Sequence, residues 1–312
     1  ICLEREARRM EYEVEKHHKL DQERALVIGG AALTEALSDP DVKMKLIHLV
    51  GMCKTVLACR VSPDQKQQLL KLIKDNVAGA RCLAIGDGAN DVAMIQQAHV
   101  GVGIRGEEGL QAVNASDYAI SQFRFLLPLL LKHGRYNYVR IVKLMTYTFY
   151  KNELMSLAQF WFNWSNGFSG QKYYSEVAIQ LYNILCTSVP IILLAVMDTD
   201  IKYRSVKRFP QFYRTGMKNQ LFNRRAFWVT LADAYIASAI CSVGPLYLIP
   251  KYARYADSFW QCGMASYIAV VCVANLKLFS FQCRWRKIHY FFIFTGILSA
   301  FGIYAVMGSA RW

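Results

Sequence analysis

The stretch LAIGDGANDVAMI, residues 83–95, decides how the first part of this sequence folds. Its apolar start predicts a buried strand that ends at Gly86, and its apolar end predicts a short helix. Asp87 leaves the strand between two glycines, and Asn90 and Asp91 follow on the first helical turn. Mg²⁺ prefers a few carboxylates beside several waters, so the pattern favours a Mg²⁺ site. The alternative is a plain turn with an aspartate helix cap.

The stretch ACRVSPDQK, residues 58–66, has a similar strand–turn–helix pattern. A strand ends at Arg60, and a Ser-Pro pair starts a helix that carries Lys66 one turn later. In a doubly wound sheet we expect this strand end to neighbour that of Asp87. Lys66 would then hold a phosphoryl oxygen, and Arg60 a nucleotide phosphate. The alternative is an exposed lysine on a helix rich in lysine.

Strands and helices alternate through residues 25–122. The expected strands are 25–30, 56–59, 82–86, 100–104 and 118–120, and the expected helices are 41–52, one beginning at 63, and 89–97. This alternation predicts an α/β domain with a parallel sheet and right-handed crossovers, whose sites lie at the carboxyl ends of the strands. Residues 1–24 are dense in charge and are expected to form a solvated helix or linker.

The character of the chain changes at Phe123. We expect a bridging helix at 123–140 and then an all-α membrane domain at 141–312. This domain holds five apolar runs, each long enough to cross a bilayer core of roughly 30 Å, near 141–163, 176–197, 226–249, 258–281 and 288–308. With 54% hydrophobic residues, the chain is too apolar for a typical soluble protein.

The formal net charge of +14 is concentrated beside the apolar runs. This placement is typical of cytosolic loops and argues against a nucleic-acid partner. The basic residues of segment 198–225 are Lys202, Arg204, Lys207, Arg208, Arg214, Lys218, Arg224 and Arg225. The positive-inside rule therefore predicts a multi-pass membrane protein with residues 1–140 and 198–225 in the cytosol.

Lys151, Asn152 and Glu153 fall in the middle of the first apolar run. A charge at that depth costs about 2.5–3.5 kcal/mol, so it usually faces the interior of the bundle or a water-filled path. We therefore favour a substrate route over a buried ion pair with another helix. Asn183 and Pro190 lie in the second run, where the proline frees a backbone carbonyl that can line a path.

These motifs in this order resemble the type-IV branch of the P-type ATPases, the phospholipid flippases. The matching stretches are CRVSPDQK, GDGANDVAMIQQAHVGVGI, EGLQA, SQFRFL, FYKN, FSGQ and LYNILCTSVP. The resemblance implies that residues 25–122 are the second half of a haloacid-dehalogenase-like phosphorylation domain. It also implies a cycle in which ATP phosphorylates an aspartate and a lipid headgroup moves between membrane leaflets.

The resemblance implies roles for five residues of the soluble part. Asp87 would ligate Mg²⁺ with support from Asp91, and Asp87 and Lys66 would be catalytic. ATP or its phosphates would contact Arg60, Lys66, Asn90 and Asp91. The implied cofactors are therefore Mg²⁺ and ATP.

In the membrane the resemblance implies a headgroup route lined by Lys151 and Asn152, with Asn183 opposite. The implied partners are a phospholipid, the membrane itself and a small accessory membrane subunit. The implied location is the plasma membrane or an endomembrane.

The chain also departs from the family pattern. The phosphorylated motif D-K-T-G-T is absent, Gly29 stands where the family has an aspartate, and Arg105 and Glu153 replace small or apolar residues. The chain also begins with Ile, so we expect a carboxy-terminal part that is inactive alone. Two alternatives stay open, a non-transporting module of a regulatory protein and a soluble Mg²⁺-dependent phosphohydrolase with a membrane anchor.

Overall fold

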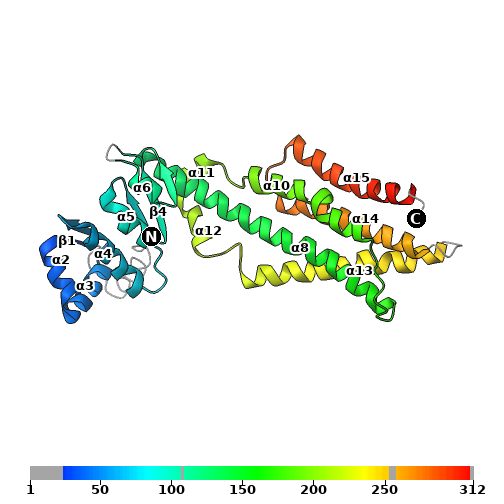
Figure 1. Ribbon diagram of the computed structural model, residues 1–312, viewed down its shortest axis with the longest axis horizontal. Coiled ribbons are helices and arrows are strands. Elements are labelled where there is room, and N and C mark those ends of the chain that lie inside the picture. The colour runs from blue at the N-terminus through cyan, green and yellow to red at the C-terminus, as the bar shows by residue number, and fades with distance from the viewer. Residues whose placement is uncertain (1–23, 107–108, 253–257, 310–312) are drawn as a thin grey trace. The chain divides into compact units, whose positions relative to one another are not determined.

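The computed structural model describes residues 24–106, 109–252 and 258–309. The chain divides into two compact units, residues 1–126 and 127–312, which we describe separately (Figure 1). Nearly all of the charged segment predicted at residues 1–24 lies outside the described residues.

The first unit begins with a two-stranded parallel sheet of β1 (Ala25–Gly29) and β2 (Thr55–Cys59). Its helices are α2 (Gly30–Ser38), α3 (Pro40–Met52) and α4 (Pro63–Asn76). The proline at the start of α4 has no amide proton to leave unpaired, and Ser62 caps the helix in a reciprocal pair with Gln65. Leu33, Leu46 and Leu72 form a small core between the helices.

A second parallel sheet of three strands follows. It contains β3 (Leu83–Gly86), β4 (Val100–Ile104) and β5 (Tyr118–Ile120), connected through η1 (Ala89–Asp91), α5 (Val92–Gln97) and α6 (Gln111–Asn114). Ala84 of β3, Ile95 of α5 and Ala112 of α6 are buried together and form a separate small core. The predicted strands, helices and parallel pairing are therefore confirmed for the described residues.

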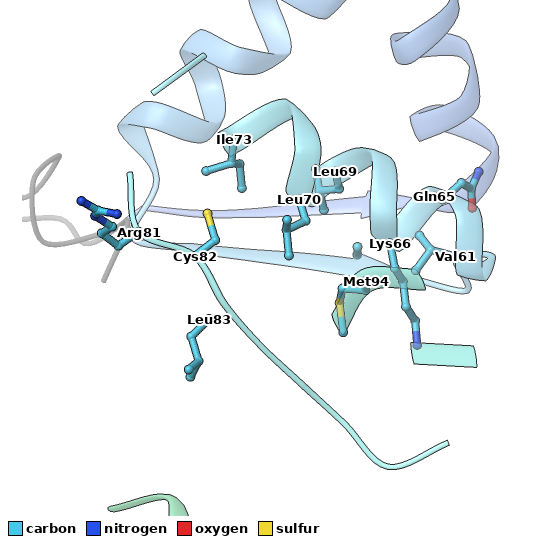
Figure 2. A pocket seen from close by; sticks show the side chains of 11 residues that line it. Val61, Gln65, Lys66, Leu69, Leu70, Ile73, Arg81, Cys82, Leu83 and Met94 are labelled. Carbon is cyan, nitrogen blue, oxygen red and sulfur yellow. The ribbon is translucent and has the colours of Figure 1, made fainter. Parts of the chain in front are cut away.

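The strands do not form one continuous sheet, however. β2 pairs with β1, and β3 pairs with β4. The prediction that the strands before Arg60 and Asp87 are neighbours in one sheet is therefore wrong, because β2 and β3 are not paired. A pocket of about 400 Å³ is lined by residues of β2, α4, β3 and α5. Figure 2 shows the apolar side chains of Leu69, Leu70 and Ile73 around this pocket, with Lys66 and Arg81 at opposite ends.

The second unit is helical, and α8 (Arg135–Ser165) is its longest helix at 31 residues. It is preceded by η2 (Phe123–Phe125) and α7 (Leu126–Pro128), and then by the π-helix η3 (Leu129–Gly134), which leads directly into it. α8 therefore runs through residue 141 without a break, and the division into a bridging segment at 123–140 and a membrane domain from 141 stays a prediction. No proline or glycine follows Gly134 within α8, so nothing interrupts its hydrogen-bond ladder.

The remaining helices of the unit pack along α8 and one another. They are α9 (Glu176–Leu181), η4 (Tyr182–Cys186), α10 (Ser188–Met197), α11 (Tyr203–Arg208), η5 (Pro210–Tyr213), α12 (Arg214–Met217), α13 (Arg224–Tyr252), α14 (Ser258–Phe281) and α15 (Lys287–Ser309). α13, yellow in Figure 1, lies beside α8. The core is rich in tyrosine, with Tyr173, Tyr174, Tyr182 and Tyr267 almost fully buried.

Among the described residues, four helices are long and apolar enough to cross a membrane. They are Glu176–Met197, Arg224–Ile249, Phe259–Phe281 and Lys287–Val306, and they coincide with four of the predicted runs. α8, which covers the other run, does not qualify. Its Lys143, Lys151 and Glu153 reduce its apolar character.

The loops at one end of the bundle are tied together by Asp198, which follows α10. Its buried carboxylate accepts hydrogen bonds from the Lys143 amine at 2.6 Å and from the backbone amides of Cys283 and Arg284 at 3.0 and 2.9 Å. Ends of α8, α10 and α14 therefore meet at one satisfied carboxylate.

Candidate functional site

The predicted metal-binding residues follow β3. Asp87 is exposed directly after the strand, and Asn90 is also exposed in the short helix η1. The Asp91 side chain is only 13% exposed and lies against Gly86. A Cβ atom at Gly86 would lie 2.2 Å from Asp91 Cβ, so only glycine allows this approach.

Lys66 reaches this site from α4. Its amine lies 2.8 Å from the Asp91 carboxylate, and its side chain is 33% exposed. The expected approach of Lys66 to the aspartate motif is therefore present although β2 and β3 are not paired, because the long side chain bridges the distance. The alternative of an unpartnered surface lysine does not hold for Lys66.

Arg60 follows β2 in an uncommon backbone conformation. Its φ is +52°, in the left-handed region that non-glycine residues seldom adopt, and the residue is exposed. A Cβ atom at Gly30 would lie 2.4 Å from the Arg60 carbonyl oxygen, so the turns after β1 and β2 fit closely. No contact joins Arg60 to Lys66 or Asp87 among the described residues.

Gln65 connects these two turns and was not singled out from the sequence. Its side-chain amide donates to the Gly30 carbonyl at 2.8 Å and to the Thr34 hydroxyl at 2.7 Å. The Ser62-x-x-Gln65 capping box is the sequence signal that could have identified it.

The oxygen-rich residue set fits Mg²⁺ better than a soft metal. The described residues contain no group of three or more His, Cys, Asp or Glu side chains placed for a metal. Mg²⁺ keeps several waters and needs only one or two carboxylates, whereas Zn²⁺ sites usually have three or four protein ligands. The exposed Asp87, with Asp91 four residues later, is compatible with the first kind of site.

The second candidate site surrounds Lys151 in the middle of α8. Lys151 is 6% exposed, and its amine donates to Asn183 Oδ1 at 2.6 Å and to Thr187 Oγ1 at 3.0 Å. The ammonium also lies 5.6 Å from the centre of the Tyr182 ring. Within the described part of the chain Lys151 forms no ion pair, so the alternative of a buried ion pair is not observed.

A break in the neighbouring span presents the two oxygen atoms to Lys151. η4 is a π-helix, and it separates α9 from α10. Such segments are rare and frequently mark functional sites. Thr187, which follows η4, is fully buried and donates its hydroxyl proton to the Tyr182 carbonyl at 3.0 Å while it accepts from Lys151. Sequence reasoning found Asn183 but missed Thr187.

Asn152 and Glu153 do not join this cluster. Successive residues of an α-helix are turned about 100° from each other, so the neighbours of Lys151 face other directions. Asn152 is exposed and Glu153 is partly exposed. The structure therefore brings Lys151 and Asn183 together, but not Asn152.

The carbonyl that Pro190 was expected to free belongs to Cys186. That carbonyl accepts a hydrogen bond from Asn275 Nδ2 at 3.1 Å. An ion pair between α14 and α13, which sequence reasoning missed, joins Lys277 to Asp233 at 2.5 Å, and the Lys277 amine lies 5.1 Å from the Tyr150 ring centre.

Known proteins resemble this chain over most of its length. The family described as phospholipid-translocating P-type ATPase C-terminal matches residues 113–312. The human protein named phospholipid-transporting ATPase ID is 40% identical over 297 residues, which cover 92% of this chain and 24% of that protein. A human probable phospholipid-transporting ATPase IM is 41% identical, with 91% and 24% covered.

A yeast protein is similar over nearly the whole chain as well. A phospholipid-transporting ATPase of Saccharomyces cerevisiae is 38% identical over 306 residues, which cover 96% of this chain and 19% of that protein. The chain thus spans about a quarter of the human relatives and less of the yeast one.

Proposed function

The chain belongs to the phospholipid-translocating P-type ATPases, and we propose that it serves ATP-driven movement of a phospholipid between membrane leaflets. The first unit would supply the Mg²⁺-binding half of an aspartyl-phosphate site, and the second unit the later membrane spans. The observation that carries the proposal is the buried Lys151 amine, held by two neutral side-chain oxygen atoms.

The chemistry around Lys151 suits a phosphate ligand. An ammonium at membrane depth is costly and favours an anionic partner, which no described residue supplies. A lipid phosphate would provide that charge and accept charge-assisted hydrogen bonds from the amine. Asn183 and Thr187 carry further hydrogen-bonding groups beside it, and we place Asn152 on an adjoining part of the headgroup route.

The open form of the first unit supports its role as part of a larger domain. Its two parallel sheets have separate small cores, and an apolar pocket lies between β2, α4 and β3. Further parallel strands between the sheets would fill the pocket and complete a haloacid-dehalogenase-like domain. We therefore propose residues 25–122 as the second half of the phosphorylation domain, 123–140 as its connection and 141–312 as the membrane domain.

The polar residues after β2 and β3 would serve phosphoryl transfer. Asp87 would ligate Mg²⁺, which neutralises phosphate charge when bound, with Asp91 as a supporting ligand. Lys66 is held by Asp91 and would contact the transferred phosphoryl group. Arg60 and Asn90 would contact ATP through its phosphates.

The basic residues of 198–225 place that loop and residues 1–140 in the cytosol in this proposal. α8 would cross the membrane as well, because Lys151 in its middle is buried against protein rather than exposed to lipid. A small accessory membrane subunit and a plasma-membrane or endomembrane location complete the proposal.

The test uses the complete reading frame that contains this chain, purified in lipid. We expect vanadate-sensitive ATP hydrolysis that phospholipid stimulates, and a Mg²⁺-dependent phosphoenzyme. Asp87→Asn should abolish the phosphoenzyme, whereas Asp75→Asn, an exposed position in the same unit, should leave it unchanged.

Two results would contradict the proposal. Normal phosphoenzyme in Asp87→Asn would remove the metal role of Asp87. A folded protein that binds ATP without lipid-dependent turnover would instead favour the non-transporting regulatory module.

A further inference from the structure

The carbonyl of Cys186 lies at the break between η4 and α10, and residue 190 cannot donate to it. In an α-helix the amide of residue 190 would donate to the carbonyl of residue 186. Residue 190 is proline, which has no amide proton. A buried carbonyl without a donor costs free energy, so another group must supply the hydrogen bond.

Asn275 of α14 supplies it. Its Nδ2 donates to the Cys186 carbonyl at 3.1 Å and to the Val271 carbonyl of its own helix at 3.0 Å. Asn275 is fully buried, and its Oδ1 has no hydrogen-bond partner among the described atoms. The side chain thus carries one unsatisfied oxygen but supplies the hydrogen bond to the Cys186 carbonyl, which an apolar residue could not do.

Gly296 of α15 approaches the same carbonyl from another helix. A Cβ atom at Gly296 would lie 2.6 Å from the Cys186 oxygen and 3.4 Å from Asn275 Oδ1. The first distance is shorter than a non-bonded contact allows, and the atom it meets is backbone. α15 can therefore lie this close only with glycine at this position.

This anchored turn is the one that faces Lys151. Thr187 follows Cys186 directly, and Asn183 lies three residues before it. Lys151 meets both residues, and its backbone carbonyl accepts a hydrogen bond from the Tyr182 hydroxyl at 2.9 Å. A rotation of the turn would move the oxygen atoms of Asn183 and Thr187 away from the amine.

We propose that Asn275 and Gly296 are positioning residues for the Lys151 site. Asn275 replaces the amide proton that Pro190 lacks, and Gly296 lets α15 close on the same carbonyl. Together they fix the turn that presents Asn183 and Thr187 to Lys151. Only the identity of the ligand, a phospholipid, rests on the function proposed above; the positioning itself does not.

The experiment compares Gly296→Ala with Gly302→Ala in the complete protein. Gly302 lies on the same helix, and an added Cβ there meets nothing within 4 Å, so Gly302→Ala is the matched control. The first measurement is the acetylation rate of Lys151 by acetic anhydride, followed by mass spectrometry with exposed Lys172 as internal standard. The second is the KM and kcat of phospholipid-stimulated ATP hydrolysis.

We expect Gly296→Ala to raise Lys151 acetylation and the lipid KM by about tenfold each, the effect of losing one hydrogen bond to a charged group. The kcat should change much less, and Gly302→Ala should match the wild type. Asn275→Leu should act like Gly296→Ala but more strongly, because it removes the side-chain donor to the buried Cys186 carbonyl. If Asn275→Leu does not fold, the comparison of Gly296→Ala with Gly302→Ala tests the proposal by itself.

Unchanged Lys151 acetylation in Gly296→Ala would overturn the positioning role, and so would an equal rise in Gly302→Ala. A rise confined to Gly296→Ala supports that role even where the wild type shows no lipid dependence. A wild type without lipid dependence would reject the proposed function, but the positioning role would still stand if acetylation rose only in Gly296→Ala.

Discussion

The two candidate sites each depend on a lysine, but the two lysines are held differently. Lys66 is 33% exposed and pairs with a carboxylate at 2.8 Å, whereas Lys151 is 6% exposed and meets neutral oxygen atoms at 2.6 and 3.0 Å. Lys66 is therefore neutralised within the protein. Lys151 keeps its charge for a partner that the described residues do not provide, so the two sites suit different tasks.

The difference follows from the surroundings of each lysine. Near water, an ion pair such as that of Lys66 adds little free energy but sets the direction of the side chain. In a bundle at membrane depth, the same pairing would cancel the attraction for an anionic ligand. Variants at each lysine can test this distinction.

The largest effect is expected from Lys151→Met, which keeps a long side chain but removes the charge. Loss of a buried charged partner costs roughly 2–5 kcal/mol, so phospholipid-stimulated turnover should fall by at least about 30-fold. Steady-state hydrolysis measured against lipid concentration checks this. The control is Lys172→Met, a 64% exposed lysine outside the site. Equal activity of Lys151→Met and Lys172→Met would show that the charge of Lys151 is not needed for turnover, and would contradict the separate task assigned to Lys151.

A smaller effect is expected from Lys66→Met. The variant leaves the Asp91 carboxylate unpaired and removes a phosphate contact, so phosphoenzyme formation should slow by about tenfold, as for one hydrogen bond to a charge. Lipid KM should not change, because Lys66 lies outside the membrane spans. Rapid-quench labelling with ATP measures the rate, and Lys71→Met on the same helix is the control. A lipid KM that shifts with Lys66→Met contradicts separate tasks for the two sites.

The smallest effect is expected from Thr187→Val, which preserves shape and removes one acceptor of the Lys151 amine. Lipid KM should rise by about three- to tenfold, and Thr187→Ser should restore it because the hydroxyl returns. The same titration of hydrolysis with lipid checks both variants. Should Thr187→Val behave as wild type, Asn183 alone would hold the amine.

Local patterns predicted much of this fold. Short apolar runs located β1 to β5, and the Ser-Pro pair located the start of α4. Apolar runs long enough to cross a bilayer predicted the four long apolar helices. The split of the sheet was not predictable from these signals, because strand pairing depends on residues distant in sequence. Hydropathy also does not show where α8 begins, because the hydropathy changes near Ile141 while the helix starts at Arg135.

The sites were predictable only in part, for a related reason. Lys151 and Asn183 are polar residues inside apolar runs, and Lys66 and Asp91 lie on the first helical turns after predicted strands, so all four are visible in the sequence. Thr187, Asn275 and Gly296 depend on the π-helical turn η4, whose geometry has no periodic signal. Pro190 pointed to a free carbonyl but not to the side chain that occupies it.

The unbroken course of α8 has a mechanical consequence. Lys151 lies 16 residues after Arg135, about 24 Å along the axis at 1.5 Å per residue. Arg135 is clamped by Asp200 at 2.7 Å and donates to the Phe212 carbonyl at 3.2 Å. The π-helical turn Leu129–Gly134 comes just before Arg135 and is the segment where bending is expected. We therefore expect α8 to move as a rigid helix beyond Arg135. A tilt at Arg135 therefore reaches the amine of Lys151 with no hinge to absorb it.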